Sequence, residues 1–506
     1  MLSKVHAAAL RGVEAFPVEV EVHVGPGEEK VVMVGLPDAA VRESIDRVST
    51  ALASSGYYLP PGKTTVNLAP ADLRKEGPSF DLPIALGWLM ASEQLAADSA
   101  GDYVIIGELA LTGEVRRVKG VLPVATRARD LGKRGVLVPT GNAAEAAVVE
   151  GLEVIPVANL REAAEFLAGT KVIAPTRVDT QAMFDVQANG ECDLAEVKGQ
   201  ETVKRALEIA AAGGHNLILI GPPGTGKSML AKRLGTILPP LTLDEALETT
   251  RIHSVAGLLE PNQALVTQRP FRAPHHTASD AGLLGGNINP SPGEISLAHH
   301  GVLFLDELPE FRRSVLETMR QPLEEGRVTI SRAAGTMTFP SEFMLVAAMN
   351  PTPDGKMPAE SRSSSREIQN YLGRISGPLL DRIDLHVEVP PVKFRDMSAQ
   401  TGGETSAAIR QRVLNARRAQ SARFEGKIPC NARMSPRNLQ RFCGLDDATR
   451  NLLKAAMEEL DLSARAYDRI LKVARTIADL ANSEKLQAEH VSEAIQYRSL
   501  DRQIWS

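Results

Sequence analysis

The order of hydrophobic and polar positions predicts two successive α/β regions followed by a helical one. Valines at every second position over 17–24 are typical of a half-buried strand, and apolar residues at helical spacing over 38–54 predict an amphipathic helix. Short apolar runs predict further strands at 31–34, 64–68, 103–106 and 135–138. Longer apolar segments predict helices at 80–91 and 122–130. We therefore expect residues 1–169 to form an α/β domain of their own.

The remaining domain boundaries are predicted from the positions where this hydrophobic pattern stops and resumes. Residues 170–192 carry little pattern and are predicted to be a linker, and a second α/β unit is predicted over 193–395. The polar, glycine-bearing segment 396–405 is predicted to be a hinge. Residues 406–506 are predicted to be all-helical. The helices within them are expected at 406–423, 435–442, 446–460, 463–481 and 488–497.

Composition narrows the class of protein. The 506 residues carry 57 Lys and Arg against 62 Asp and Glu, a net charge of −5, which excludes a strongly basic overall field but not local basic patches. The three cysteines are widely spaced, which excludes a disulfide framework and a four-cysteine zinc site. No apolar run approaches the ~18 residues of a membrane span, and the N-terminus is not typical of a signal peptide. We expect a cytoplasmic protein without membrane contact.

A phosphate-binding loop is predicted after the apolar run 217–220. The sequence GPPGTGKS has the spacing GxxxxGK[ST] and leads into a predicted helix, which is the strand–loop–helix context that this motif needs. Lys227 is expected to bridge the β- and γ-phosphates, and Ser228 is expected to hold Mg²⁺. The nucleotide contacts are expected from Gly221, Pro222, Pro223, Gly224, Thr225, Gly226, Lys227, Ser228 and Met229. The alternative, an incidental glycine-rich turn, is disfavoured by this context.

Two further apolar runs end in side chains suited to nucleotide chemistry. In GVLFLDE, Asp306 and Glu307 follow a buried strand, at the end where α/β sheets bind ligands. Asp306 is expected to bind Mg²⁺ through water, and Glu307 is expected to orient the attacking water. In VAAMN, Asn350 can hydrogen-bond the γ-phosphate or that water. Each pattern alone is also typical of ordinary strand ends, and gains meaning only beside a phosphate-binding loop.

Long stretches of the chain resemble the AAA+ ATPases, and within them the magnesium-chelatase-like proteins of the ComM/YifB type. The resemblance covers nearly the whole chain, in stretches such as VKGQETVKRALEIAAAGGHNLILIGPPGTGKSMLA (197–231), RPFRAPHHTASDAGLLGG (269–286) and RISGPLLDRIDLHVEVP (374–390). It implies a multidomain α/β fold. The parts are an S5-like domain similar to that of Lon proteases, a P-loop AAA+ module with a helix-2 insert and a hairpin before sensor 1, and a C-terminal all-α lid. It also puts Gly199 and Gln200 near the adenine.

The resemblance assigns roles that the patterns alone leave open. Asn350 matches sensor 1, and Arg382 matches the arginine finger that reaches the γ-phosphate of a neighbouring subunit. Arg465 matches sensor 2 in the lid, with Arg469 as a nearby alternative. The alternative for each arginine is an ordinary ion pair on a helix. A finger that acts between subunits implies a ring, and the resemblance implies a homo-hexamer that uses ATP and Mg²⁺.

The resemblance also implies basic elements that contact DNA. The helix-2 insert carries Arg269 and Arg272, and the hairpin expected over 327–339 carries Arg332 close to its turn. In a ring, one copy of Arg332 from each subunit would line the pore, where an arginine suits sequence-independent phosphate contact. A solvated hairpin tip is the alternative. The arginine-rich helix 406–423 is expected to touch DNA or an acidic neighbour, or to present a solvated face.

The chain departs from its relatives after sensor 1. The cysteine cluster of the relatives is replaced here by Thr352, Asp354, Ser361 and Ser363. No zinc is therefore expected. The pairs His275-His276 and His299-His300 are expected to hydrogen-bond or pack rather than share a metal, because adjacent side chains on a strand point to opposite faces.

A second departure concerns the N-terminal domain. Ser79 matches the nucleophile of Lon-type proteases, but Leu122 fills the position of the lysine that would take its proton. Lys119 is displaced from that position by three residues. No protease activity is expected, and the domain is interpreted as an assembly or DNA-handling collar.

These features together predict a hexameric, ATP- and Mg²⁺-dependent motor that acts on single-stranded or branched DNA. The resemblance further implies branch migration that helps incoming DNA recombine during natural transformation. One alternative is a metal-insertion motor like that of magnesium chelatase, which lacks such an N-terminal domain. The others are an ATP-dependent protease, which Leu122 disfavours, and a nucleotide-switched scaffold, which the intact Lys227, Glu307 and Arg382 disfavour.

Overall fold

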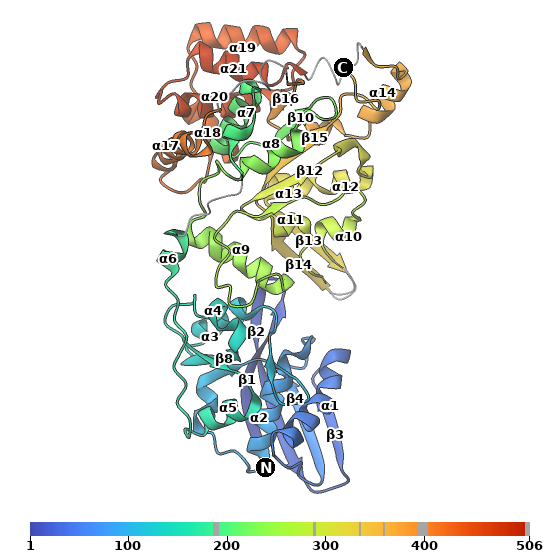
Figure 1. The fold of residues 1–506 in the computed structure, drawn as a ribbon, viewed down its shortest axis with the longest axis vertical. Coiled ribbons are helices and arrows are strands. Elements are labelled where there is room, and N and C mark those ends of the chain that lie inside the picture. Colours follow the sequence, from blue (N-terminus) through green and yellow to red (C-terminus); the bar gives the residue numbers. More distant parts are fainter. Residues whose placement is uncertain (186–191, 287–289, 333–334, 358–359, 393–402, 501–506) are drawn as a thin grey trace.

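The structure is a computed structural model that describes residues 1–185, 192–286, 290–332, 335–357, 360–392 and 403–500. An N-terminal α/β domain lies at one end of an elongated molecule, a helical C-terminal domain lies at the other end, and a second α/β module lies between them (Figure 1). Residues 186–191 of the expected linker and 396–402 of the expected hinge lie outside the described residues. No helix in the described ranges is long and apolar enough to cross a membrane.

One seven-stranded sheet forms the N-terminal domain, in the order β3-β4-β2-β1-β5-β8-β9. Its strands are β1 (Leu2–Arg11), β2 (Glu14–Gly25), β3 (Lys30–Val34), β4 (Lys63–Ala69), β5 (Tyr103–Ile105), β8 (Gly135–Pro139) and β9 (Glu153–Val157). Val18, Val20 and Val22 of β2 are buried, while the glutamates between them are partly exposed, as the alternation predicts. β1 pairs with β2 antiparallel along its whole length, and with β5 in parallel.

Helices and a short ribbon complete this domain. They are α1 (Ala39–Ser54), α2 (Asp81–Ala91), α3 (Val121–Asp130), α4 (Ala143–Ala146), α5 (Leu160–Leu167), α6 (Thr180–Asp185), β6 (Glu108–Leu109) and β7 (Val115–Arg116). α2 is buried along nearly its whole length, and it lies against β1 and β2. Because both of its faces are covered, its sequence LPIALGWLMA carries no polar stripe.

The second α/β module is built on a parallel sheet in the order β11-β12-β15-β10-β16. Its strands are β10 (Leu217–Ile220), β11 (Phe271–Arg272), β12 (Val302–Leu305), β15 (Met344–Met349) and β16 (Leu385–Glu388). Its helices are α7 (Glu201–Gly213), α8 (Lys227–Leu234), α9 (Leu243–Ala256), α10 (Asp280–Leu284), α11 (Glu294–Leu297), α12 (Arg313–Thr318), α13 (Arg320–Glu325), α14 (Ser365–Leu372) and α15 (Gly377–Leu380). The antiparallel hairpin β13 (Arg327–Arg332) and β14 (Gly335–Pro340) projects from it, and the residues of its turn lie outside the described ranges.

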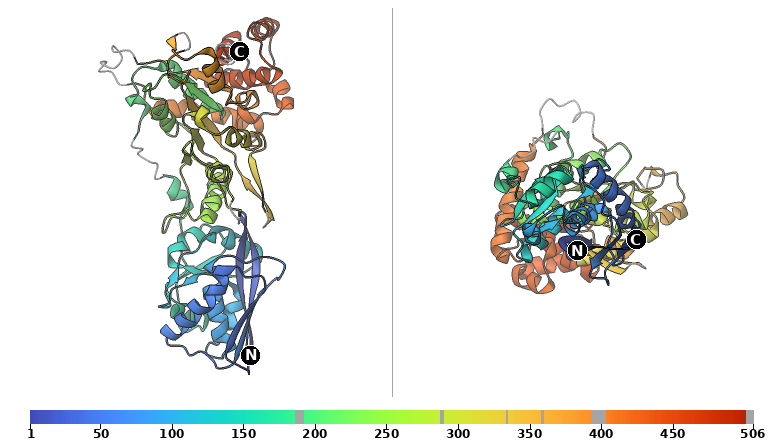
Figure 2. Two further views of the ribbon diagram at one scale, coloured as in Figure 1. Left: turned by 90° about the vertical axis from the view of Figure 1, so that its right-hand side faces the viewer. Right: turned by 90° about the horizontal axis from the view of Figure 1, so that it is seen from below.

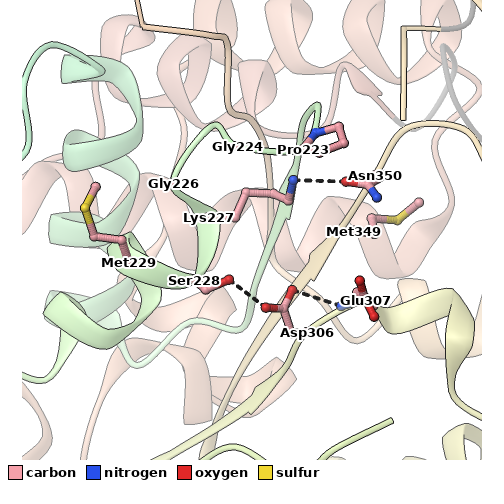
Figure 3. Close-up of a pocket in the computed structure, with 10 residues that line it drawn as sticks. All are labelled: Pro223, Gly224, Gly226, Lys227, Ser228, Met229, Asp306, Glu307, Met349 and Asn350. Carbon is pink, nitrogen blue, oxygen red and sulfur yellow. Dashed lines mark hydrogen bonds between the residues drawn. The ribbon is translucent and has the colours of Figure 1, made fainter. Parts of the chain in front are cut away.

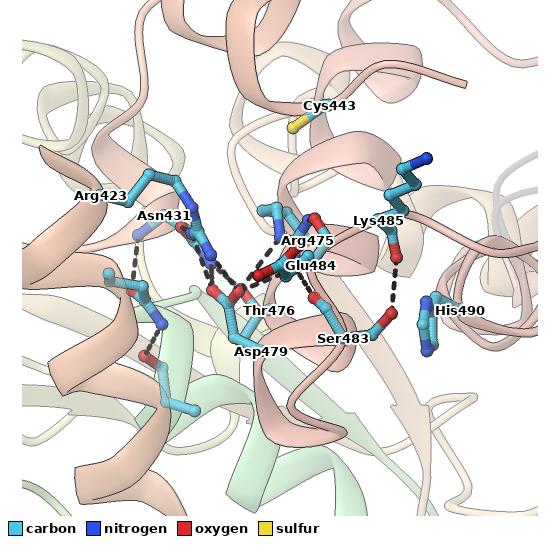
Figure 4. A network of polar contacts seen from close by, with 12 residues as sticks. Arg423, Asn431, Cys443, Arg475, Thr476, Asp479, Ser483, Glu484, Lys485 and His490 are labelled. Atoms are coloured by element: carbon cyan, nitrogen blue, oxygen red, sulfur yellow. Dashed lines mark hydrogen bonds and ion pairs between the residues drawn. The ribbon is translucent and has the colours of Figure 1, made fainter. Parts of the chain in front are cut away.

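Within residues 403–500, five α-helices form the C-terminal domain. They are α17 (Ser406–Phe424), α18 (Pro436–Phe442), α19 (Asp447–Glu459), α20 (Ala464–Leu480) and α21 (Ala488–Gln496). A buried polar network ties α17 to α20 (Figure 4). The Asp479 carboxylate accepts hydrogen bonds from Arg423 Nη1 at 2.9 Å, from Asn431 Nδ2 at 2.8 Å and from Arg475 Nε at 3.1 Å. Arg475 is only 1% exposed, and it also donates to the backbone oxygens of Ser483 and Glu484.

Replacing Asp479 by alanine is expected to lower the free energy of unfolding of this domain by about 3–5 kcal/mol, because the change leaves the buried Arg475 and its neighbour Arg423 without their anion. Urea denaturation followed by far-UV circular dichroism measures the effect. Asp447→Ala is the matched control, because Asp447 forms an exposed ion pair with Arg450 and such pairs contribute little. Equal denaturation midpoints for both variants would contradict the prediction.

Four arginines of α17 have partners within the chain, which favours a structural role for them over the three alternatives of a contact with DNA, a contact with an acidic neighbour or a solvated face. Arg410 donates to the Thr236 carbonyl, and Arg417 donates to the carbonyls of Ala211 and Pro429. Arg412 pairs with Glu208 and Glu404, and Arg423 pairs with Asp479. The sequence pattern missed Glu208 and Asp479 because they lie far away along the chain, and it missed Glu404 because that residue lies just before the helix.

The N-terminal domain is held against the second module by α9 and the loop after it. Buried Glu145 accepts hydrogen bonds from the N–H of Leu122 and from the Ser254 hydroxyl, and burial raises its pKa. Gly120 N–H donates to the Ser254 carbonyl at 3.1 Å. The β1–β2 turn reaches the same module, where Val13 packs against the hydrophobic cluster that contains Ile330 of the hairpin (Figure 2). Leu122 is therefore buried beside an interdomain contact.

Candidate nucleotide-binding site

The phosphate-binding loop joins β10 to α8 at the carboxyl end of the parallel sheet. Gly224 and Gly226 have φ of +78° and +85°, a backbone conformation that only glycine adopts without strain. Lys227 is largely buried, and its Nζ donates to the carbonyl oxygens of Gly221 at 2.6 Å and Pro222 at 2.9 Å. Burial lowers the pKa of Lys227. In this state the lysine is folded back onto its own loop.

A cavity of about 390 Å³ opens beside this loop (Figure 3). It is lined by Pro223, Gly224, Gly226, Lys227, Ser228, Met229, Asp306, Glu307, Met349 and Asn350. These residues come from the loop, from the end of β12 and from the end of β15, which are three neighbouring strand ends of one sheet. The P-loop, the Asp306-Glu307 pair and Asn350, which the sequence singled out for nucleotide chemistry, thus contribute to a single cavity.

The hydroxyl and carboxylate expected to hold magnesium lie in contact. Ser228 Oγ is 2.6 Å from Asp306 Oδ2, and the other oxygen, Asp306 Oδ1, accepts the Glu307 N–H at 3.0 Å. A hydroxyl and a carboxylate are the hard oxygen ligands that Mg²⁺ prefers, so the donor set fits this ion. Glu307 has φ of +53°, a strained conformation for a non-glycine residue of the kind found at functional sites.

His276 is a contact that the sequence reasoning left without a specific role. Its Nδ1 lies 3.2 Å from Glu307 Oε2, and its ring packs edge-on against Phe311. His276 lies on the segment between β11 and α10, so a residue outside the P-loop and the sheet reaches the carboxylate in the cavity. Two adjacent histidines within the insert are a weak sequence signal, and only the fold shows which of them meets Glu307.

Asn350 lies at the end of β15 and faces the lysine. Lys227 Nζ donates to Asn350 Oδ1 at 3.1 Å (Figure 3). The backbone oxygen of Asn350 accepts a hydrogen bond from the Tyr371 hydroxyl at 3.3 Å, and burial raises the pKa of Tyr371 to about 12. Tyr371 on α14 thereby helps to position the backbone of Asn350. No sequence motif indicated this contact.

Gly199 and Gln200 lie next to the phosphate-binding loop. Gln200 Nε2 donates to the carbonyls of Thr225 at 2.9 Å and Pro390 at 3.1 Å, so it links the loop to the segment after β16. Gly199 and Gln200 both have positive φ, at +63° and +56°. Within the described ranges the buried Gln200 Oε1 has no hydrogen-bond partner.

Two arginines expected to take part in hydrolysis, Arg382 toward a neighbouring subunit and Arg465 from the lid, lie outside the cavity of their own chain. Among the described residues, neither Arg382 nor Arg465 lines the cavity. Arg382 is 6% exposed and pairs with Glu324 on α13. Arg465, at the start of α20, is 63% exposed in its side chain and lies 3.5 Å from Asp381. Arg469, the alternative to Arg465, forms a 2.8 Å ion pair with the buried Asp384 and is therefore bound to the sheet.

Of the three arginines expected to contact DNA, only Arg332 is exposed and without an ion pair among the described residues. Arg269 donates to the carbonyls of Pro239, Pro240 and His300 and pairs with Glu245, and burial lowers its pKa. Its geometry is that of a structural residue, which corrects the expectation. Arg272 forms a two-point ion pair with Glu294, both bonds at 2.7 Å, so its charge is already neutralised.

The pair His299-His300 lies in a turn, which corrects the assumption of a strand. The ring centroids are 3.9 Å apart, and both Nε2 atoms contact Glu248 Oε2, at 3.2 and 2.8 Å. These three side chains lie within the reach of one metal ion. However, His299 Nδ1 accepts the Glu342 N–H at 2.9 Å, so its proton is on Nε2, the atom that would bind the metal. The hydrogen bonds to the two histidines hold the pKa of Glu248 at about 2.

Comparisons with known proteins cover the whole of this arrangement. Residues 193–397 match the family described as "Magnesium chelatase, subunit ChlI", residues 20–142 match "Subunit ChlI of Mg-chelatase", and residues 403–498 match "Magnesium chelatase, subunit ChlI C-terminal". The chain is 46% identical over 505 residues to the competence protein ComM of Haemophilus influenzae, covering 99% of this chain and 98% of that protein.

Other relatives agree with this match. The uncharacterized protein YifB of Escherichia coli is 45% identical over 506 residues, covering 99% of this chain and 98% of that protein. The magnesium-chelatase 67 kDa subunit of Heliobacterium mobile is 26% identical over 222 residues, which is 38% of this chain and 30% of that protein. The sheet, the site and the full-length matches therefore agree, and the chain belongs to the magnesium-chelatase-like AAA+ proteins of the ComM/YifB type.

Proposed function

We propose that the chain is an Mg²⁺-dependent ATPase that works as a homo-hexameric ring and moves along DNA. The observation that carries the proposal is the incomplete site: Lys227, Asp306 and Glu307 meet in one cavity, whereas Arg382 and Arg465 lie outside it. Because no arginine of the described residues lines this cavity, we infer that a neighbouring subunit supplies them. Such a head-to-tail contact closes into a ring.

Five residues of the cavity have a proposed task in hydrolysis. Lys227 would bind the phosphates, and Ser228, together with Asp306 through water, would hold the Mg²⁺, which when bound neutralises charge on the β- and γ-phosphates. Glu307 accepts a hydrogen bond from the attacking water, and Asn350 orients that water or the γ-phosphate. Met229 borders the cavity on the helix side. Gln200 Oε1 offers an acceptor that suits the amino group of adenine.

DNA is the proposed client because of the hairpin and the relatives. Arg332 is exposed where β13 ends, and the strands of the hairpin extend away from the core of the module (Figure 1). The full-length relative is named a competence protein, and branch migration of incoming DNA during natural transformation is the activity that we infer for this chain. The second candidate is a chelatase-like motor that acts on a protein partner, which the partial match to a magnesium-chelatase subunit supports.

The test is the ATPase rate with and without single-stranded, duplex and four-way-junction DNA, with Glu307→Gln as the blank. Stimulation by DNA is expected, and the strongest stimulation by junctions would favour branch migration over simple translocation. An ATPase rate that none of these DNA substrates changes would overturn the DNA-motor proposal and favour the protein-directed motor. Sedimentation with ATP and Mg²⁺ measures the number of subunits.

Arg332→Ala is expected to weaken DNA binding at every sequence and to leave nucleotide affinity unchanged. Each lost phosphate contact should reduce the slope of log affinity against log salt concentration by about one. Fluorescence anisotropy with labelled single-stranded DNA measures both quantities. Arg327→Ala is the matched control, because Arg327 lies at the other end of β13 and pairs with Glu325. If both variants bind like the native chain, the hairpin tip is merely solvated.

A further inference from the structure

The Asp354 carboxylate joins residues of the segment after Asn350 by hydrogen bonds. Asp354 Oδ1 lies 2.7 Å from the Thr352 hydroxyl and 2.8 Å from the Ser361 hydroxyl, and Asp354 Oδ2 accepts the Arg362 N–H at 2.9 Å. The Ser363 N–H in turn donates to Ser361 Oγ at 3.1 Å. These donors hold the pKa of Asp354 well below its usual range. The four positions that lack the relatives' cysteines are therefore joined by hydrogen bonds.

This loop rests on the phosphate-binding loop. Gly355 has φ of +79°, and a Cβ on it would lie 2.7 Å from Pro223 Cδ, so the backbone of residue 355 lies flat on that proline. Pro223 itself lines the nucleotide cavity. Any shift of Gly355 toward the cavity would push Pro223 with it.

The other end of the loop is anchored at the site and in the core. Asn350, which lines the cavity, lies two residues before Thr352, and Thr352 is 0% exposed. The Thr352 carbonyl accepts the Gly355 N–H at 3.0 Å, which makes the turn that carries Gly355 to Pro223. Asp354 therefore closes a short connection between two walls of the cavity, Asn350 on β15 and Pro223 on the P-loop.

We propose that Asp354 is a positioning residue of the nucleotide site, which sets the spacing of Pro223 and Asn350 through the hydrogen bonds that it accepts from Thr352, Ser361 and Arg362. Asp354 does not line the cavity, and it acts by preventing residues 352–357 from shifting against the P-loop. The proposal rests on the proposed ATPase function. The Asp354 carboxylate thus holds its hydrogen-bond donors in place, as a covalent cross-link would.

Asp354→Ala tests the proposal, with Asp446→Ala as the matched control. Asp446 is also an aspartate that accepts a backbone N–H, but it caps α19 in the C-terminal domain, away from the cavity. The dissociation constant for a fluorescent ADP, and kcat and KM for ATP, are measured for each protein. Asp354→Ala is expected to lower kcat/KM by about tenfold or more, since small displacements of catalytic groups are costly, while Asp446→Ala matches the native chain.

Two further variants keep the test decisive if Asp354→Ala does not fold. Gly355→Ala forces a Cβ against Pro223 and is expected mainly to weaken nucleotide binding. Gly426→Ala, at a similar φ of +72° but with nothing within 4 Å of the new Cβ, carries the same backbone strain and is expected to leave nucleotide binding unchanged. Ser361→Ala removes one of the donors and is expected to give an intermediate loss that Ser361→Thr restores. Native-like kcat and KM in folded Asp354→Ala or in Gly355→Ala would overturn the proposal. A native chain that binds no nucleotide would instead overturn the proposed function.

Discussion

Exchanging Glu307 for glutamine is expected to lower ATP turnover by about 10²- to 10⁴-fold, the range that a positioned general base contributes. Glutamine keeps the size of the side chain but loses the anion that polarises the attacking water. The carboxylate lies in the same cavity as Lys227 and Ser228, and it is held there by a strained backbone and by His276. Steady-state phosphate release measures the loss.

Nucleotide binding is the control for this prediction. Glu307 contacts neither Lys227 nor Ser228 in the described hydrogen bonds, whereas Asp306 contacts Ser228 directly. Affinity for ATP should therefore survive Glu307→Gln, and the variant should trap the ATP-bound assembly. Turnover within tenfold of the native rate would show that another group activates the water.

Replacing Arg382 by alanine is expected to lower the rate of ATP turnover in the assembled ring by about 10³-fold or more. The reason is that an arginine finger neutralises charge that develops in the transition state. The variant Arg382→Ala should still bind nucleotide, since Arg382 does not line the cavity of its own subunit. In the isolated chain this guanidinium pairs with Glu324 instead. The finger must therefore leave Glu324, or carry it along, when subunits associate.

Mixing two inactive variants tests whether Arg382 acts on the site of a neighbouring subunit or on the site of its own. Arg382→Ala and Glu307→Gln subunits are each inactive alone, but a Glu307→Gln subunit can lend its Arg382 to the intact cavity of an Arg382→Ala neighbour. In rings assembled at random from equal amounts, about a quarter of the interfaces should then be active. No recovery on mixing would mean that Arg382 acts within its own subunit, or only as a structural partner of Glu324.

Local sequence predicted many of the elements but missed others, among them β9, α5 and β1, and β1 shows the physical reason. Its alternating positions are occupied largely by alanine, in the run Ala7, Ala8 and Ala9, and alanine has a low preference for strands. The strand exists because β2 and β5 pair with it on both sides and α2 covers it. Backbone pairing in the assembled sheet overrode a weak local preference.

For the site, the sequence alone determined the groups that lie next to one another along the chain or at strand ends. The P-loop, Asp306 and Asn350 follow short apolar runs, and parallel strands bring their carboxyl ends together wherever such runs pair. The tertiary structure decided the partners of long polar side chains. It assigned His276 to Glu307 and Arg269 to the interior, because such partners lie far apart in sequence and meet only when packing brings their segments together.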